Sequence, residues 1–417
     1  MSTSPFLARP RVALIGVSGY GNVYYTMLLE MHQQGKIQLT AVTIIDPGKE
    51  TAIVAALTAL GCEIFEDFRL MLERHRGRLE LCAIPTGIPW HTPMTLAALA
   101  AGAHVLVEKP LAATVEEVEE IRAAESRHGR TVMVGFQYHY VEANQQLKRL
   151  LNAGEIGRLR RIRIIGLWPR GAEYYHRTDW AGRVKSGATW VYDSPFSNAF
   201  AHHLSLALYF AGPAPAASAS PVRVAAEFYR AQPIENFDTG ALRAETNTGV
   251  AIHFYASHSC SSNCDPEIVI EGERGTVTWL HNQHYVVAAD GAVPRQVSLG
   301  HELAARQQMF HDVFARLAGA PVFVCGTDIA REHTRCIQAA QSAAAPRDIP
   351  RVWLKDNGLA GPHRRIWIAG VEESLRRAFD SAQSLSQAGC AWAVAPAEIL
   401  VSQLDRTGAG VPSPVSK

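Results

Sequence analysis

The most informative stretch of this chain is Val12-Ala-Leu-Ile-Gly16-Val-Ser-Gly19-Tyr-Gly21, in which an apolar run gives way to spaced glycines. A short run of Val, Ile and Leu is typical of a strand buried on both faces, and the glycines mark its turn into a helix. Glycines at such a turn let the backbone approach a pyrophosphate closely, and the first amides of the helix favour its charge. The stretch therefore predicts a dinucleotide site at the carboxyl end of the first strand.

A second motif, Glu108-Lys109-Pro110, directly follows the apolar run 104–107. If that run is a strand of the same parallel sheet, Lys109 lies at its carboxyl end, on the side where open sheets bind ligands. The two motifs together predict a nicotinamide enzyme that holds a lysine beside the reactive carbon of its cofactor.

Short apolar runs alternate with helical patterns through the first third of the chain. We expect strands at 12–15, 39–45, 79–84, 104–107 and 131–134, and the clearest helices at 91–101 and 114–128. Thr114 and Glu117 have the spacing of a capping box at the start of the second helix. Regular alternation of this kind predicts an α/β domain with a doubly wound parallel sheet, which we place at residues 1–135.

Longer runs, with polar and apolar residues alternating, follow Gly135. We expect strands at 159–168, 222–230, 248–257, 266–271, 274–279 and 284–289, and helices at 142–153 and 363–388. Such alternation is typical of an antiparallel or mixed sheet with one covered face. We therefore assign residues 136–417 to a second domain, with a frayed tail at 404–417.

The composition is that of an ordinary globular protein, with 417 residues, 47% hydrophobic residues, 19% charged residues and a formal net charge of +1. The balanced charge speaks against a nucleic-acid partner. The N-terminus lacks a basic segment followed by a long apolar one, and no apolar run is long enough to span a membrane. We therefore expect a cytoplasmic protein with a small-molecule partner and no membrane partner.

Seven scattered cysteines argue against a disulfide framework. The segment His258-x-Cys260-x3-Cys264 contains residue types that bind zinc, but its spacing is unusual and no second Cys/His pair follows it. We expect buried or incidental thiols there and no metal site.

Asp46 lies at the end of the second expected strand, 25 residues after Gly21. A carboxylate at this position accepts hydrogen bonds from the ribose hydroxyls of NAD and repels the extra phosphate of NADP. The alternative is an N-cap for the helix that follows Pro47. We favour NAD, and Lys49 keeps NADP open because an ammonium group can meet a phosphate.

These motifs resemble those of the glucose–fructose oxidoreductase/inositol dehydrogenase group, written Gfo/Idh/MocA. The resemblance covers the first domain and rests on the glycine stretch, the segment from His91 to Pro110, Val134-Gly135-Phe136, the segment 147–157 and the turn at Glu271-Gly272. It implies a Rossmann domain, then an α/β domain whose large, mostly antiparallel open sheet forms a homodimer or homotetramer. It also implies hydride exchange between a sugar or polyol carbon and nicotinamide.

The resemblance and the strand-end positions together assign a set of residues to the cofactor. They are Gly16, Ser18, Gly19, Tyr20, Gly21, Asn22, Asp46, Pro85, Thr86, His91, Glu108, Lys109 and Gln137. The loop from Pro85 to His91 is two residues longer than is usual in the family, and we expect it still to flank the nicotinamide ribose.

The family's second catalytic element is an Asp-x3-His pair on a helix. His202 falls on the family's histidine, whereas Asn198 stands where the Asp is usual. An amide can orient a hydroxyl but cannot ionise, so Asp193 is our candidate for the missing charge. Because oxidation of an alcohol requires removal of a proton, we assign His202 as the principal acid or base and Lys109 as the orienting, proton-relaying partner, although these two roles are interchangeable.

An aromatic and basic segment covers residues 168–192, where six of 25 residues are aromatic against 8% for the whole chain. Aromatic faces pack on the C–H surfaces of sugars, and arginine hydrogen-bonds hydroxyls or carboxylates. The alternative is a packed loop with snorkelling arginines. Our expected substrate contacts are Arg170, Tyr175, Trp180, Arg183 and Tyr192.

Three functions fit these residues. The first is an NAD(P)-dependent dehydrogenase that acts on the CH–OH group of a sugar, a sugar acid or a cyclic polyol. The second is a glycoside-cleaving enzyme that oxidises its sugar transiently, for which Tyr192 or Asp193 would be the base. The third is a non-catalytic nucleotide-binding regulator. We favour the first, and the presence of both Lys109 and His202 speaks against the third.

Overall fold

The computed structural model describes residues 9–406 and divides into two compact units. The first unit holds the described residues up to 140 together with 306–330, and the second holds 141–305 and the described residues from 331 onward. The expected boundary at 135 lies close to the end of the first segment. The return of 306–330 has no local signal, because it depends on contacts between distant parts of the chain. Most of the expected tail at 404–417 lies outside the described residues.

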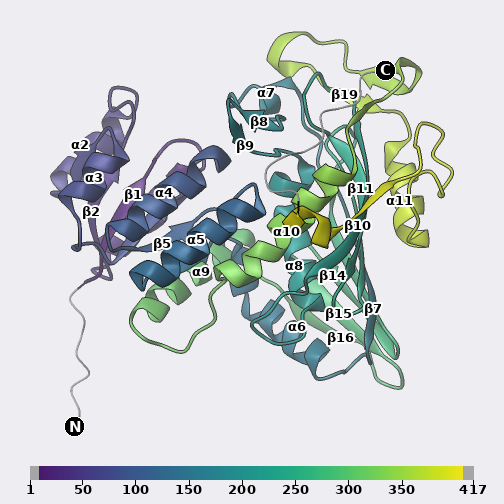
Figure 1. Cartoon of the computed structure of the whole chain (residues 1–417), viewed down its shortest axis with the longest axis horizontal. Helices are drawn as coiled ribbons and strands as arrows, with labels where there is room; N and C mark the ends of the chain where they lie inside the picture. The colour runs from purple at the N-terminus through teal and green to yellow at the C-terminus, as the bar shows by residue number, and fades with distance from the viewer. Residues whose placement is uncertain (1–8, 407–417) are drawn as a thin grey trace. The chain divides into compact units, whose positions relative to one another are not determined.

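The first unit contains a six-stranded parallel sheet (Figure 1). Its strands are β1 (Arg11–Ile15), β2 (Gln38–Thr43), β3 (Glu63–Phe65), β4 (Leu81–Ile84), β5 (His104–Val107) and β6 (Val132–Val134), in the spatial order β3-β2-β1-β4-β5-β6. The order reverses at β1, which pairs with both β2 and β4, and ligands bind at such a switch point. The expected doubly wound parallel sheet is confirmed, and β3 is a strand that the apolar runs do not predict.

The helices of the first unit alternate with its strands. They are α1 (Gly21–Gln33), α2 (Thr51–Ala59), α3 (Phe68–Arg74), α4 (Ile88–Ala100) and α5 (Val115–His128), followed by the turn η1 (Gln137–Tyr140) and most of α9 (Glu302–Leu317). The capping box of α5 is confirmed, because the Glu117 amide donates to Thr114 Oγ1 at 3.3 Å and the Thr114 amide donates to the Glu117 carboxylate at 3.1 Å. α4 begins earlier than expected because Pro89 suits the first turn of a helix.

The second unit is built on one large mixed sheet. Its strands are β7 (Leu159–Leu167), β10 (Pro221–Arg230), β11 (Thr239–Thr246), β12 (Ala251–Ser257), β13 (Cys264–Gly272), β14 (Gly275–Leu280), β15 (His284–Ala289), β16 (Arg295–Ser298), β17 (Arg347–Asp348) and β20 (Ala397–Leu400). Only β7 with β12 and β10 with β17 pair in parallel among the described strands of this sheet. The expected large and mostly antiparallel sheet is confirmed.

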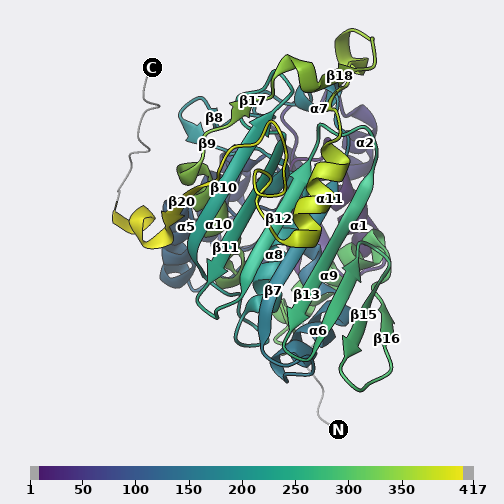
Figure 2. The ribbon, with the colours of Figure 1, turned by 90° about the vertical axis from the view of Figure 1, so that its right-hand side faces the viewer.

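Helices lie on both faces of this sheet. Figure 2 shows α11 (Val371–Ser381) lying across one face, where Tyr229, Tyr255, Phe379 and Trp392 share a hydrophobic core. The helices α6 (Glu142–Asn152) and α8 (Ala201–Ala211) lie on the opposite side in Figure 1, and α10 (Thr327–Ala343) completes the long helices. The C-terminal segment therefore covers part of one face of the sheet.

The expected helix at 363–388 is wrong in part. Only α11 is helical there, because Gly370 and Ala382 adopt left-handed conformations at its two ends. The preceding residues form a hairpin of β18 (Leu354–Asp356) and β19 (Ile366–Ile368), with the short turns η3 (Arg351–Trp353) and η4 (Gly361–His363) beside it. Pairing of the two short strands satisfies backbone groups that a helix would otherwise bond internally.

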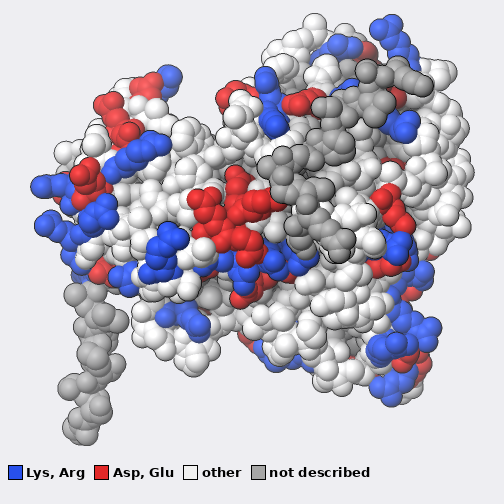
Figure 3. Space-filling view, in the orientation of Figure 1, with Lys and Arg blue, Asp and Glu red and all other residues white. Residues whose placement is uncertain are grey.

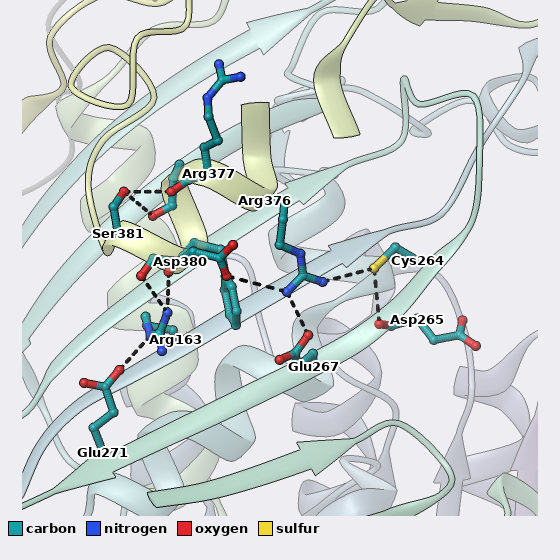
Figure 4. A network of polar contacts seen from close by, with 11 residues as sticks. Arg163, Cys264, Asp265, Glu267, Glu271, Arg376, Arg377, Asp380 and Ser381 are labelled. Carbon is teal, nitrogen blue, oxygen red and sulfur yellow. Dashed lines mark hydrogen bonds and ion pairs between the residues drawn. The ribbon is translucent and has the colours of Figure 1, made fainter. Parts of the chain in front are cut away.

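A network of ion pairs attaches α11 to the sheet (Figure 4). Arg163 on β7 donates to Glu271 Oε1 at 2.7 Å and to the backbone carbonyl of Phe379 at 2.7 Å. Arg376 on α11 donates to Glu267 Oε2 on β13 at 2.9 Å. A guanidinium on the last carbonyls of a helix opposes its negative end, so Arg163 holds the C-terminus of α11 against β7.

A buried carboxyl group anchors the segment that follows α11. Glu227 on β10 accepts hydrogen bonds from the Leu385 amide at 2.7 Å and from the Tyr229 hydroxyl at 2.8 Å. Burial raises the pKa of Glu227 to about 7, although both hydrogen bonds oppose the shift.

This carboxyl group makes stability depend on pH. The folded chain keeps the Glu227 proton between its ordinary pKa and about 7, so the stability contributed by this site falls as pH rises through that window. The unfolding free energy of Glu227→Gln minus that of wild type should therefore rise by about 2 kcal/mol from pH 5 to pH 8. Urea titrations at both pH values measure this, with exposed Glu173→Gln as control. An equal difference at the two pH values would contradict it.

Acidic and basic side chains both occur on the face drawn in Figure 3. The formal net charge of +1 shows that the two signs nearly cancel over the whole chain. Within the part of the chain that the structure describes, no helix is both long enough and apolar enough to cross a membrane.

Candidate functional site

The glycine stretch forms the turn from β1 to α1. Gly16 and Gly19 have φ values of +92° and +56°, which favour glycine. A Cβ on Gly21 would lie 2.6 Å from the backbone oxygen of Gly16, so the two segments of the loop pack too closely for any side chain. Ser18, Tyr20 and Asn22 are exposed around this turn.

The N-terminus of α1 is suited to an anion. Its N-cap residue Tyr20 makes no side-chain capping hydrogen bond, and its first turn contains no acidic residue. The positive end of the helix dipole is therefore left uncompensated by its own side chains. Together with the close packing at Gly21, this geometry fits the pyrophosphate of a dinucleotide.

Replacing Gly21 with alanine tests the loop directly. The new Cβ would clash with the backbone oxygen and the carbonyl carbon of Gly16, so the loop must move. We expect NAD affinity to fall by about tenfold or more, which corresponds to about 1.4 kcal/mol. Fluorescence titration with NAD measures this, and exposed Thr26→Ala on the same helix is the control. Unchanged affinity in Gly21→Ala would show that the turn does not hold the dinucleotide.

Asp46 follows the end of β2 and is exposed. Its carboxylate pairs with the Lys49 ammonium at 2.9 Å, and this hydrogen bond lowers the pKa of Asp46. The N-cap of α2 is Glu50, so the alternative of Asp46 as that N-cap is wrong. The lysine that kept NADP open is thus already paired with a carboxylate.

Glu108 and Lys109 lie at the carboxyl end of β5, as their sequence position predicts. Glu108 is buried, accepts from the Tyr24 hydroxyl at 2.9 Å and from the Lys109 amide at 3.1 Å, and has a pKa raised by burial. A Cβ on Gly135 would lie 2.6 Å from Glu108 Oε1, so glycine is required beside this carboxyl group. Glu108 therefore holds the backbone of the half-buried Lys109 in place.

Local sequence alone does not reveal the partner of Glu108. Tyr24 lies 84 residues away, on α1, and it packs edge-on against Phe310 of α9 with ring centroids 5.0 Å apart. The hydroxyl of a buried tyrosine usually finds a hydrogen-bond partner, and that is the one available signal.

The loop before α4 is held by a buried histidine. His91 Nδ1 lies 2.7 Å from the Pro110 carbonyl oxygen, and its Nε2 lies 3.0 Å from that of Thr86. Burial lowers the pKa of His91, so its neutral ring donates to one of these carbonyls at a time. The structure places His91 as a brace between two loops, and Pro85 and Thr86 lie on the braced loop.

Gln137 begins the turn after β6. Its side chain is buried, and its Oε1 atom has no hydrogen-bond partner within the described part of the chain. A buried amide oxygen usually accepts a hydrogen bond, and a bound ligand can supply the donor. This too fits a dinucleotide at the carboxyl edge of the sheet.

The second unit brings Asp193 and Asn198 together. Asn198 lies in the π-helical turn η2 (Pro195–Ala199), directly before α8. Its Nδ2 donates to Asp193 Oδ1 at 2.8 Å, and the Gly182 amide donates to Asp193 Oδ2 at 2.6 Å. A buried carboxylate therefore contacts the asparagine that stands in the usual aspartate position.

His202 lies on the first turn of α8, four residues after Asn198, and it is buried. The C-terminus of the same helix is held by Lys148, whose Nζ donates to the Tyr209 carbonyl at 2.5 Å and the Gly212 carbonyl at 2.6 Å. Burial lowers the pKa of Lys148 to about 7. Lys148 therefore anchors the helix that carries His202.

An arginine that sequence reasoning did not single out lies beside Asp193. Arg177 Nη2 is 3.7 Å from Asp193 Oδ2, and its guanidinium lies 3.7 Å from the ring centroid of Tyr174. Arg170 and Trp180 belong to the same cluster, because Arg170 lies over the Tyr174 ring at 5.1 Å and Arg177 lies over the Trp180 ring at 5.4 Å. The signal was present in the aromatic and basic segment, which contains all of these residues.

Tyr175 adjoins this cluster, because its ring packs edge-on against that of Tyr174 with centroids 5.1 Å apart. Tyr175 and Arg183 line a cavity of about 700 Å³, which is formed by residues of the segment 172–183 together with residues of 232–235 and 361–366. Tyr192 is buried and stacks on Trp190 with ring centroids 5.0 Å apart. The role of these five residues in substrate binding stays a prediction.

The segment from His258 to Cys264, which contains residue types that bind zinc, lies within the described residues. His258 Nδ1 lies 2.9 Å from the Trp168 carbonyl oxygen, Cys260 is buried, and burial raises its pKa to about 12. Among the described residues, no three His, Cys, Asp or Glu side chains are grouped so that they could hold a metal ion.

Both units match known families. Residues 10–136 match the oxidoreductase family with an NAD-binding Rossmann fold, and residues 144–278 match the GFO/IDH/MocA C-terminal domain. An inositol 2-dehydrogenase of Pseudomonas fluorescens is 34% identical over 170 residues, which cover 40% of this chain and 49% of that protein. The chain thus spans about half the length of this relative.

Solved structures share the fold of this chain. The WlbA dehydrogenase of Bordetella pertussis, in complex with NADH and UDP-GlcNAcA, has a TM-score of 0.64 and 21% identity over 80% of this chain and 95% of that one. An inositol dehydrogenase homologue of Azotobacter vinelandii, complexed with NADH and myo-inositol, has a TM-score of 0.64 and 19% identity over 80% of this chain and 96% of that one.

Proposed function

The chain belongs to the Gfo/Idh/MocA family of NAD-binding oxidoreductases, and we propose that it transfers a hydride between nicotinamide and a hydroxyl-bearing carbon of a sugar, sugar acid or cyclic polyol. The family membership supports the hydride chemistry, and the inositol 2-dehydrogenase relative supports a polyhydroxylated substrate. The finer substrate class is the proposal.

The observation that carries this proposal is the contact between Asp193 and Asn198. Asp193 Oδ1 accepts from Asn198 Nδ2 at 2.8 Å. A carboxylate therefore lies beside the asparagine that stands where the family usually has an aspartate. Helix α8, which follows η2 along the chain, carries His202. The second unit therefore retains the residue types needed to handle a proton, namely a carboxylate and an imidazole.

We assign roles to these side chains as follows. NAD, when bound, supplies the acceptor for the hydride. His202 takes the hydroxyl proton as the carbon–hydrogen bond breaks, and Asp193 with Asn198 orients the hydroxyl groups of the substrate. Lys109 hydrogen-bonds the reacting oxygen and relays the proton between this oxygen and His202, so in the reverse direction protonated His202 returns the proton to the alkoxide by the same path.

A second candidate function is supported by the cavity beside residues 181–183. Ala181 and Arg183 line it, and the amide of Gly182 between them donates to Asp193. A cavity of about 700 Å³ is large enough for a second sugar ring or an aglycone. This observation favours the glycoside-cleaving enzyme that oxidises its sugar transiently.

One assay separates the candidates. Purified protein is mixed with NAD and a panel of sugars, sugar acids, cyclic polyols and chromogenic glycosides, and NADH absorbance and aglycone release are followed together. NADH formation without aglycone release supports the dehydrogenase. Aglycone release that requires NAD without net NADH supports the second candidate. Silence in both signals, with NAD still bound, would overturn both and favour the regulator.

The homodimer or homotetramer through the open sheet stays a proposal. α11 and the segment that includes Leu385, Cys390 and Trp392 cover part of one face of that sheet. Less of this face is therefore free for a second subunit than a bare sheet would offer. Light scattering of the purified chain gives its mass in solution, and a monomer would contradict the proposal.

A further inference from the structure

The carboxylate of Glu50, which belongs neither to the glycine stretch nor to the Glu108-Lys109-Pro110 motif, contacts the glycine loop. Ser18 lies in that loop, and its Oγ donates to Glu50 Oε1 at 2.5 Å. Glu50 is 32 residues away, at the start of α2, so the contact joins the turn after β1 to the loop after β2. The phosphates and the adenosine ribose of a dinucleotide are bound by these two turns.

Glu50 is directed away from its own helix. It occupies the N-cap of α2 with φ −116° and ψ 36°, yet its side chain makes no capping hydrogen bond. A residue at an N-cap commonly accepts from the amides of the first turn. Here the carboxylate bonds Ser18 instead, which places its negative charge beside the dinucleotide loop.

The charges of the chain segment that holds Glu50 are unequal. Between residues 38 and 60 the charged residues are Asp46, Lys49 and Glu50. The Lys49 ammonium lies 2.9 Å from Asp46 Oδ2, so its charge is matched by that carboxylate. Glu50 is the charge left over, and the segment as a whole has a net charge of −1.

We propose that Glu50, held by Ser18, is a second cofactor-specificity residue that excludes a phosphate from the adenosine ribose. NAD carries only hydroxyls at that position, and these can donate to a carboxylate. NADP carries a dianionic phosphate there, which Glu50 repels and which the paired Lys49 does not compensate. The preference for NAD over NADP therefore depends on two carboxylates, Asp46 and Glu50.

The test is direct binding of both dinucleotides to the whole chain, without any substrate. Calorimetric titration gives the Kd of NAD and of NADP for wild type, Glu50→Gln and Ser18→Ala. Glu50→Gln should strengthen NADP binding by about tenfold and change the Kd of NAD by less than about threefold, since one like charge near the phosphate is removed. Ser18→Ala frees the Glu50 carboxylate. It should lower the ratio of the NADP Kd to the NAD Kd, but by a smaller factor than Glu50→Gln does.

Exposed Glu73→Gln on α3 removes the same charge elsewhere in the unit and should leave the ratio unchanged. Salt provides a readout that a steric role would not move, because screening shortens from about 30 Å at 0.01 M to about 3 Å at 1 M. The tenfold effect should therefore shrink to less than threefold at 1 M salt. A ratio within twofold of wild type in Glu50→Gln at low salt, or an effect independent of salt, would overturn the proposal.

The outcome is independent of the reaction proposed above. If no sugar or polyol is oxidised but both dinucleotides bind, the Kd ratios still decide the role of Glu50. If wild type binds neither dinucleotide, the cofactor site itself is refuted and the role of Glu50 with it.

Discussion

Lys109→Met is expected to lower kcat by about 10³-fold, within the range that a positioned proton-transfer group contributes. Methionine keeps the length of the side chain but can neither donate a hydrogen bond nor carry a proton. Glu108 holds the backbone of this residue through its amide at 3.1 Å, and methionine retains that amide. The Kd of NAD should therefore stay within threefold of wild type, and the loss should appear in kcat.

Stopped-flow measurement of NADH formation, with the best substrate from the panel, provides kcat, and calorimetry provides the Kd of NAD. The matched control is Lys36→Met, since Lys36 is exposed and lies two residues before β2, at the amino edge of the same sheet. A kcat in Lys109→Met within tenfold of wild type would remove Lys109 from the chemistry.

The second largest effect is expected for Asp193→Asn. Asp193→Asn removes the carboxylate that accepts from Asn198, and we expect kcat to fall by about 10²-fold because the pair that orients the hydroxyl groups of the substrate loses its charge. Asn198→Asp alone places two carboxylates where the atoms now lie 2.8 Å apart, which raises the pKa of one of them and favours its protonated form.

The double variant Asp193→Asn/Asn198→Asp restores one carboxylate and one amide with their positions reversed. It should recover kcat to within about tenfold of wild type, which neither structural damage nor loss of a single contact would allow. Exposed Asp290→Asn in the second unit is the control for loss of a carboxylate. If the double variant is no more active than Asp193→Asn, the charge is needed at Asp193 itself; full activity of Asp193→Asn would refute its role.

Much of the fold follows from local sequence. The run Val12–Ile15 followed by glycines became β1 and the turn into α1, because burial on both faces and positive φ values are properties of a few adjacent residues. The capping box at Thr114 formed for the same reason. Alternation over 159–168 and 266–271 correctly indicated β7 and β13 of the large sheet.

Predictions weakened where neighbours in space are not neighbours in sequence. The pattern at 363–388 is helical by periodicity, yet β19 pairs with β18 before α11 begins. The cavity that Tyr175 and Arg183 line was not predictable for a similar reason, since part of its lining comes from the distant segments 232–235 and 361–366.

By itself, the sequence determined the alternation of strands and helices in the first domain, the glycine turn and the end of β5 at Glu108-Lys109, because each depends on residues within a few positions of one another. Only the tertiary structure decided that Tyr24 bonds Glu108 across 84 residues and that Glu50 bonds Ser18 across 32. A side chain can be recognised as a donor or an acceptor from its chemistry, but its partner is set by the path of the whole chain through the core.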